Sequence, residues 1–209
     1  YPKDALETLI SEVEKIDNQD DYISVMGLSA DENGKIVGDK YPNNGFDGSI
    51  FEMRYKYKVR GDKFGIFITK TYQREISGKD FSQYEGKGYI PQSVIFNEYD
   101  ARGIKTRFVN KIVRFYLKDD DDAASVSNTR WSRKNLFGLA EGHLSFLNCS
   151  GNQLLSYPKA LLRNLIGYQT YALKNGRKIS TIIADVKNPL IKILGILALP
   201  FSLIYQKLK

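Results

Sequence analysis

The sequence predicts a fold that mixes helices and strands, of the α/β class with α+β as the alternative. An amphipathic helical pattern near the start, strand-like runs rich in aromatic and β-branched residues, and further helical segments between and after them support this prediction. The 209 residues, 42% hydrophobic and 26% charged, are enough for one soluble domain of ordinary size with a sizeable core.

The first third of the chain alternates between helix, strand and loop signals. Residues 4–16 predict a helix with acidic residues in its first turns, which suit the helix dipole. Its apolar face is expected to comprise Ala5, Leu6, Leu9, Ile10, Val13 and Ile16. Residues 22–29 predict a strand, and an Asn-Gly turn at 33–34 leads to a second short extended run. Residues 39–49, rich in Gly, Pro and Asn, predict a loop, while 49–59 fits helix or strand.

The remaining elements are bounded mainly by proline and glycine. Residues 64–71 look like a buried strand, 92–102 like a helix opened by a proline and closed by a glycine, and 106–117 like one or two strands. Two helical segments follow at roughly 133–148 and 158–174. The second begins at a proline and ends at an Asn-Gly pair.

Charge is distributed unevenly along the chain, whose net charge is +7. Residues 1–50 carry 4 basic against 11 acidic residues, whereas 51–118 carry 15 against 7. Residues 119–129 add four acids without a base, and 130–209 carry 12 basic against 2 acidic residues. A basic body of this kind suits nucleic acid, anionic lipid head groups or a phosphorylated small molecule, and charge alone does not choose among them.

Cysteine and histidine are too few for several classes of site. The single cysteine, Cys149, excludes an intrachain disulfide and favours a cytosolic setting. The single histidine, His143, excludes a site that needs two imidazoles, and no Cys/His cluster is present for structural zinc. The chain begins with Tyr1 and no signal-peptide pattern follows, so we expect it to be part of a longer protein.

The C-terminal tail, residues 189–209, contains an apolar run from Ile193 to Tyr205 that Pro200 interrupts. The run is shorter than the roughly 20 apolar residues of a membrane-spanning helix. Its basic flanks are Lys187, Lys192, Lys207 and Lys209. The pattern favours an interfacial segment whose lysines meet lipid phosphates, with a helix docked on the protein's own core as the alternative.

Three segments resemble, in order and spacing, the later part of glycosyltransferase family 2, whose members have the GT-A fold. The helix that follows the family's metal-binding Asp-x-Asp motif is similar to YPKDALETL (1–9). Its Gly-Asp-Lys segment and strand resemble GDKFGIFITKTYQRE (61–75). Its acidic loop, Pro-acid pair, aromatic residue, helix and strand resemble EGKGYIPQSVIFNEYDARGIKTRFVNKIVRFYL (85–117). The resemblance covers about residues 1–175 and is strongest to members that build capsular, exopolysaccharide or wall polymers.

The resemblance implies that the nucleotide-binding half of the domain, with the Asp-x-Asp motif, lies upstream of Tyr1. A divalent metal, Mg or Mn, would be held mainly by residues outside this chain and would neutralise the diphosphate leaving group. No residue of this chain is predicted as a metal ligand. The run Asp119–Asp122 is not taken as the motif, because adjacent carboxylates on a loop repel each other and are usually a solvated surface.

Glu85 and Gln92 are the candidate catalytic residues. In an inverting member of the family, a carboxylate at a helix start removes the proton of the acceptor hydroxyl, and an aromatic residue follows in the next turn. If Phe96 is that aromatic residue, the base position falls on Gln92, which cannot take a proton at neutral pH. Glu85 then supplies the base, or the register differs, or the activity has been lost or altered.

The resemblance also suggests substrate-binding residues. Asp62 and Lys63 would bind a sugar hydroxyl and a phosphate, with a surface turn and a local ion pair as the alternative. Tyr89 and Phe96, together with Tyr84, would stack on a sugar, although such aromatic residues are more often part of a core. The basic residues considered for pyrophosphate or a lipid-linked acceptor are Lys111, Arg114, Arg130, Arg133 and Lys134.

The resemblance therefore predicts a transferase that moves a sugar from a nucleotide-sugar donor to a polysaccharide or lipid-linked glycan at the cytoplasmic face of the membrane. Residues 1–130 would form the acceptor-side part of the catalytic domain, 131–188 a helical extension and 189–209 a tail on the membrane surface. This chain alone is expected to be inactive. The alternative is a basic nucleic-acid-binding module without enzymatic activity. No RNA-recognition motif, zinc finger or recognition-helix pattern supports it, so no nucleic-acid partner is predicted.

Overall fold

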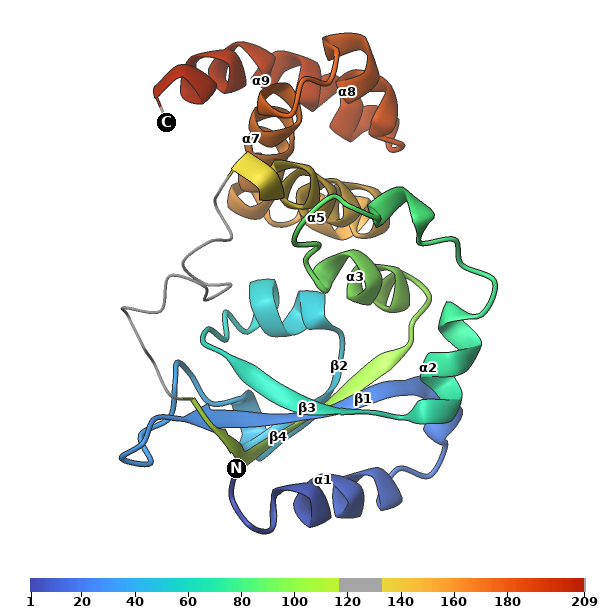
Figure 1. The fold of residues 1–209 in the computed structure, drawn as a ribbon, viewed down its shortest axis with the longest axis vertical. Helices are drawn as coiled ribbons and strands as arrows, with labels where there is room; N and C mark the ends of the chain where they lie inside the picture. Colours follow the sequence, from blue (N-terminus) through green and yellow to red (C-terminus); the bar gives the residue numbers. More distant parts are fainter. Residues whose placement is uncertain (117–132, 209) are drawn as a thin grey trace. The chain divides into compact units, whose positions relative to one another are not determined.

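The structure is a computed structural model that describes residues 1–116 and 133–208 (Figure 1). Its chain divides into two compact units, each described here by itself. Unit 1 holds a four-stranded mixed sheet, and the described part of unit 2 is built of helices. The α/β class with C-terminal helices is therefore confirmed.

The two units do not follow the expected boundary near residue 130. Unit 1 comprises Tyr1–Lys79 and Tyr99–Asp119, and unit 2 comprises Asp80–Glu98 and Asp120–Lys209. The segment that carries the candidate catalytic residues thus groups with the C-terminal helices rather than with the sheet.

The sheet has the strand order β2-β4-β1-β3. Its strands are β1 (Tyr22–Ala30), β2 (Gly45–Gly48), β3 (Lys63–Phe67) and β4 (Lys105–Phe115). β1 pairs with β4 in parallel and with β3 antiparallel, and β2 pairs with β4 antiparallel. Nearly every residue of β1 is buried, as expected of a central strand that is covered on both faces.

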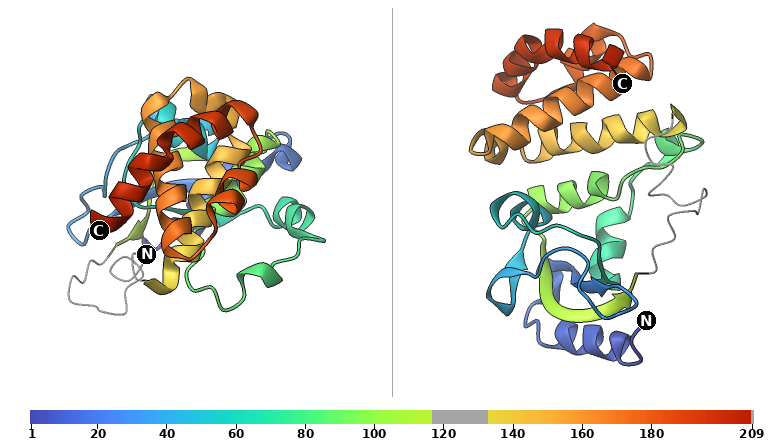
Figure 2. Two further views of the ribbon diagram at one scale, coloured as in Figure 1. Left: turned by 90° about the horizontal axis from the view of Figure 1, so that it is seen from above. Right: turned by 90° about the vertical axis from the view of Figure 1, so that its left-hand side faces the viewer.

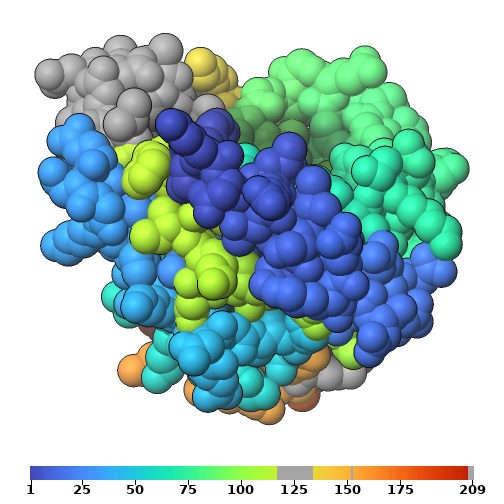
Figure 3. All heavy atoms as spheres, turned by 90° about the horizontal axis from the view of Figure 1, so that it is seen from below, coloured from blue at the N-terminus to red at the C-terminus, as the bar shows by residue number. Residues whose placement is uncertain are grey.

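Alternate side chains of the sheet form two apolar clusters. On one face, α1 (Ala5–Glu14) packs against β1 and β4, and Figure 3 shows α1 lying across this face. The cluster on this face comprises Ala5, Leu9, Ile16, Val25, Ile68, Val109 and Val113. The second cluster is built on Leu28, Tyr41, Val59 and Phe108. Leu6 and Ile10, predicted to lie on the apolar face of α1, are 61% and 44% exposed, because only one edge of the helix meets the sheet.

Three predictions for unit 1 need correction. The strand predicted at 64–71 ends at Phe67, and α2 (Thr69–Ile76) begins two residues later. β3 is partly exposed rather than buried, because it is an edge strand that pairs only with β1. The predicted loop 39–49 contains the 3-10 turn η2 (Pro42–Asn44) and β2. The ambiguous segment 49–59 is helical at residues 50–56 and includes the π-type turn η3 (Glu52–Lys56).

A half-buried carboxylate accepts hydrogen bonds from the backbone just before this turn. Asp100 lies on α3 (Ser93–Ala101) and accepts the backbone N–H groups of Ile50 at 3.1 Å and Phe51 at 2.9 Å. Burial raises the pKa of Asp100 to about 6, and the two hydrogen bonds only partly oppose this effect.

Stability is therefore expected to decrease as pH rises from 4 to 7. The folded chain holds the Asp100 proton more tightly than the unfolded chain. The protonated carboxyl therefore stabilises the fold fully below the ordinary pKa of Asp, and this contribution is lost as pH rises through about 6. The change is on the order of 2–3 kcal/mol. Urea unfolding of the wild type and of Asp100→Asn measures it, and the variant should show a flatter dependence on pH. Equal slopes in the two proteins would contradict the assignment.

From residue 133 on, the described part of unit 2 contains helices connected by short turns. They are η5 (Arg133–Asn135), α5 (Leu136–Cys149), α6 (Gly151–Leu155), α7 (Pro158–Lys174), α8 (Ile179–Asp185) and α9 (Pro189–Leu208). α7 packs against α5 on one side and α9 on the other (Figure 2). The predicted helices at 133–148 and 158–174 are confirmed, and a left-handed Gly176 follows α7 at φ 82°.

Candidate active-site loop

Residues 80–92 form the loop that carries Glu85 and leads into α3. The loop contains one 3-10 turn, η4 (Ser82–Tyr84), which begins where Asp80 Oδ1 accepts the Ser82 N–H at 2.8 Å. Hydrogen bonds from the Ser82 side chain and backbone lower the pKa of Asp80. The first half of the loop is thus held by its own local hydrogen bonds.

The second half of the loop lies against the start of α5. Asn135, only 2% exposed, accepts the Tyr89 N–H through Oδ1 at 2.9 Å. Gly138 lies so close to this backbone that a Cβ at position 138 would be 2.0 Å from Tyr89 O. Only glycine fits there, and the backbone path of the loop is fixed by α5 as a consequence.

Glu85 is an exposed carboxylate of this loop, as is Asp80, whose Oδ1 accepts the Ser82 N–H. Its backbone N–H donates to Ser82 O at 3.1 Å, which places the residue directly after η4. Within residues 1–116 and 133–208, nothing donates a hydrogen bond to its carboxylate. Glu85 therefore combines a fixed backbone with an oxygen pair that is open to a ligand.

Gln92 lies at the mouth of α3, as predicted. Its carbonyl oxygen accepts the N–H groups of Ile95 at 3.0 Å and Phe96 at 3.1 Å, so it is the residue before the first helical one. Its side chain is exposed. A carboxylate at this position would face solvent at a helix N-terminus, where negative charge is favoured.

The aromatic residues divide into a buried and an accessible set. Phe96 is 5% exposed, so its ring has no open face for a sugar and the stacking role expected for it is not supported. Tyr89 and Tyr84 are partly exposed. The Tyr84 ring meets Phe137 edge to face at 6.3 Å, and Lys87 Nζ lies 5.6 Å from the centre of the Phe137 ring. Phe137 was not predicted, because nothing in the local sequence relates α5 to the loop.

Sequence reasoning also missed two carboxylates near Tyr84. Burial raises the pKa of the Tyr84 hydroxyl, and the negative charges of Glu141 and Glu98 raise it further. Glu141, on α5, pairs with Arg177, which in turn contacts Asp185 at 3.0 Å. The partners are up to 36 residues apart, so no periodicity or motif connects them in the sequence.

Asp62 and Lys63 belong to unit 1 and are engaged with other residues of that unit. The Asp62 carboxylate pairs with Arg114, and Lys63 Nζ donates to Asp39 O at 2.7 Å. Burial lowers the pKa of Lys63. Gly61 has φ 87°, which confirms the tight turn before β3. The surface turn of the alternative is present, but the ion pair joins Asp62 to Arg114, 52 residues away, and a ligand would have to displace these contacts.

Several predicted features fall on residues that are not described. The acidic run Asp119–Asp122 and Arg130 lie outside the described residues, as does the side chain of Arg133. Lys111 and Lys134 are exposed. In the described ranges, no group of three His, Cys, Asp or Glu residues is placed to hold a metal ion.

The tail forms one continuous helix, α9, rather than a broken run. Pro200 lies inside it, where the missing N–H removes a single backbone hydrogen bond. In the part of the chain that the structure describes, α9 is the one helix whose length and composition would allow it to cross a membrane. Only 22% of that stretch is buried.

The structure thus brings Glu85, Tyr89 and Gln92 onto one loop of unit 2, with Asp62 and Lys63 in unit 1. We found no family model, no curated protein and no solved structure that matches this chain.

Proposed function

We propose that this chain forms the acceptor-side part of a GT-A glycosyltransferase. The enzyme would transfer a sugar from a nucleotide-sugar donor to a polysaccharide or lipid-linked glycan. The order and spacing of three segments that resemble family 2 support this proposal, as does the mixed sheet of unit 1. The nucleotide-binding strands and the divalent Mg or Mn ion of the family would belong to residues outside this chain.

One observation carries the proposal: an exposed carboxylate lies on a loop whose backbone is fixed. The Glu85 side chain is exposed and its N–H donates to Ser82 O, and four residues later Asn135 and Gly138 hold the loop backbone at Tyr89 against α5. A catalytic group needs this combination, since its position must be set before the substrate arrives.

Glu85 would act as the general base of the transfer. Its carboxylate would accept the proton of an acceptor hydroxyl as that oxygen bonds to the anomeric carbon of the donor sugar. The bond from the anomeric carbon to the diphosphate breaks in the same reaction. Tyr84 and Tyr89, the partly exposed aromatic residues of this loop, would flank the acceptor sugar.

Donor binding tests how the site is divided between this chain and the rest of the protein. Calorimetry should detect metal-dependent binding of a nucleotide sugar to the full-length protein and none to residues 1–209 alone. Circular dichroism of the shorter protein serves as the control for folding. Micromolar, metal-dependent binding by residues 1–209 would mean that the donor site lies within them and that the proposed division is wrong.

We further propose that α9 rests on the membrane surface at the cytoplasmic face. A narrow face of small or buried residues, Ile191, Gly195, Ala198 and Ser202, is turned toward the protein. The opposite face exposes Leu190, Ile193, Ile196, Leu197, Phe201 and Ile204, each by 47% or more. Such a contiguous apolar surface favours an interfacial location, and the exposed Lys187 suits anionic head groups.

Deleting residues 189–209 would be a poor test of this role, because α9 also completes the protein core. Gln169, 3% exposed, donates to Gly195 O at 2.7 Å and accepts from Ser202 Oγ at 2.7 Å. Removal of α9 would leave this buried amide without either partner, at a cost of roughly 1–3 kcal/mol for each lost bond.

Substitutions on the exposed face provide a cleaner prediction. Ile193→Glu together with Leu197→Glu should weaken binding to vesicles containing anionic lipid by at least about tenfold, since two apolar side chains no longer enter the interface. Sedimentation with vesicles measures the effect. Leu6→Glu, an equally exposed apolar position on α1, is the matched control. Unchanged vesicle binding by the double variant would rule out this surface as the membrane contact.

A further inference from the structure

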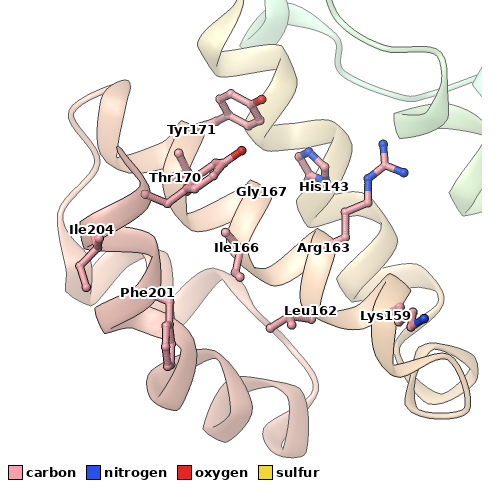
Figure 4. Close-up of a pocket in the computed structure, with 11 residues that line it drawn as sticks. His143, Lys159, Leu162, Arg163, Ile166, Gly167, Thr170, Tyr171, Phe201 and Ile204 are labelled. Atoms are coloured by element: carbon pink, nitrogen blue, oxygen red, sulfur yellow. The ribbon is translucent and has the colours of Figure 1, made fainter. Parts of the chain in front are cut away.

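A pocket of about 630 Å³ lies within unit 2, between α5, α7 and α9 (Figure 4). Pockets of this size accommodate small molecules or a lipid chain. Its lining comprises His143, Lys159, Leu162, Arg163, Ile166, Gly167, Thr170, Tyr171, Phe201, Ile204 and Tyr205. None of these residues belongs to the candidate active-site loop, so the pocket is a separate feature.

Large apolar side chains from two helices face this space. Phe201 and Ile204 of α9 lie across from Leu162 and Ile166 of α7 (Figure 4). Phe201 is 65% exposed, Ile204 60% and Leu162 51%, so the protein itself leaves these walls uncovered. Phe201 and Ile204 also belong to the apolar face of α9, which makes the pocket continuous with the proposed membrane surface. An apolar chain entering from that surface would cover both walls.

Two cations lie at one end of the pocket. Lys159 and Arg163 are four residues apart on α7 and therefore occupy the same helix face. Both are exposed, and no described acidic side chain pairs with either. Neither α7 nor α9 contains an Asp or Glu. The two side chains therefore present positive charge that complements an anionic head group.

Further polar groups lie along the pocket wall, and Figure 4 shows His143 beside Arg163. Thr170, 2% exposed, has a hydroxyl without a hydrogen-bond partner among the described residues. Gly167 lets the His143 ring lie against α7, where its Nδ1 is 3.0 Å from Asn164 Oδ1. Asn164 Nδ2 donates to Ala160 O, so Oδ1 is the acceptor and His143 Nδ1 carries the hydrogen. These polar groups favour a ligand that carries an oxygen atom and disfavour a pure hydrocarbon.

We infer that this pocket binds one single-chain acyl lipid that carries a phosphate head group. The phosphate meets Lys159 and Arg163, the acyl chain lies between α7 and α9, and an ester oxygen is available to the polar wall. This binding site does not depend on the transfer reaction proposed above. It would hold unit 2 to the membrane through a specific lipid in addition to the general affinity of α9.

Calorimetry with lauroyl lysophosphatidic acid, below its micelle concentration, tests the inference on the full chain. We expect saturable binding of one lipid per chain. Monolauroylglycerol lacks the phosphate and glycerol 3-phosphate lacks the chain, and each should bind at least about tenfold more weakly. Together these two probes distinguish a lipid site from a site for free phosphate.

Matched variants locate the site. Lys159→Gln with Arg163→Gln should weaken lysophosphatidic acid binding by about tenfold or more, whereas Lys174→Gln at the far end of α7 should not. Ile204→Asp should also weaken binding, while Ile196→Asp, on α9 but outside the pocket lining, should leave it unchanged. The substituted Lys and Arg side chains are polar surface groups, and Ile196 and Ile204 are 47% and 60% exposed. The variants should therefore still fold, and circular dichroism can verify this.

Three results would overturn the inference. They are wild-type affinity in the Lys159 and Arg163 double variant, equal affinity for monolauroylglycerol, or equal affinity for glycerol 3-phosphate. The first would remove the cations from the site, the second would indicate unspecific apolar binding, and the third would indicate a surface anion site. Each of these measurements is independent of sugar transfer. The proposed function can therefore be wrong while this inference holds, and this inference can be wrong while the proposed function holds.

Discussion

Replacing Glu85 by Gln in the full-length protein is expected to lower kcat by about 10²–10⁴-fold, the range for loss of general-base assistance. The amide keeps the size of the side chain on a loop that is already fixed, but it cannot accept the proton. Donor affinity should change little, because the substitution removes an interaction made in the transition state. Release of nucleoside diphosphate with a defined acceptor measures the rate, and the wild-type rate should fall toward acidic pH.

The same assay distinguishes Glu85 from Gln92. If the base position is 92, Gln92→Glu should raise the rate and Glu85→Gln should do little, because only the former restores a carboxylate at the start of α3. Glu32→Gln, at an exposed turn of unit 1, is the control for loss of one surface charge. If neither position alters the rate by more than about threefold, below about 0.7 kcal/mol of barrier, this loop is not the catalytic centre.

Gly138→Ala is expected to damage both stability and activity. The added Cβ would lie 2.0 Å from the backbone oxygen of Tyr89, so either α5 or the loop must move. Overpacking of this kind costs about 1–3 kcal/mol. Because displacement of a catalytic group by roughly 1 Å can cost about 10²-fold in rate, kcat should fall even in the folded fraction.

Gly142→Ala, one turn further along α5, is the matched control. There the added Cβ would lie 3.2 Å from a side-chain atom of Pro91, which can yield more easily than backbone. Urea unfolding and the nucleotide-release assay compare the two variants. Equal stability and kcat in Gly138→Ala and wild type would show that α5 does not fix the loop, and the geometric support for Glu85 as the base would be lost.

Local signals predicted α7 and β1 closely but missed α2 and β2. α7 follows the sequence closely because a proline begins it and a left-handed glycine ends the turn after it. The strand predicted at 64–71 was placed too far toward the C-terminus, because the aromatic and β-branched residues continue into α2. A short apolar run fits the period of a helix as well as that of a strand. β2 was not predicted, because its segment is rich in Gly and Asn and has low strand propensity. Its pairing with β4 makes it a strand.

The candidate site was predicted only in the part that is local in sequence. Glu85 and Gln92 were identified through the resemblance to glycosyltransferase family 2, on a loop and helix start that local signals predicted. Asn135 and Gly138, which hold the loop, are far along the chain, and the Tyr89–Asn135 pair is separated by 46 residues. For Phe96 the helical position was predicted, and its buried ring, 5% exposed, matches the core role that was the alternative to stacking on a sugar.

The most direct test of the central claim is whether the full-length protein adds a sugar to an acceptor. The protein would be incubated with a panel of nucleotide sugars, a divalent metal and glycan or lipid-linked acceptors, and the acceptor mass measured by mass spectrometry. The account predicts that the acceptor gains one sugar residue for each nucleoside diphosphate released, and that the gain is lost in Glu85→Gln. If the folded protein transfers no sugar from any donor of the panel, or if transfer is equally fast without a carboxylate at position 85 or 92, the account is contradicted.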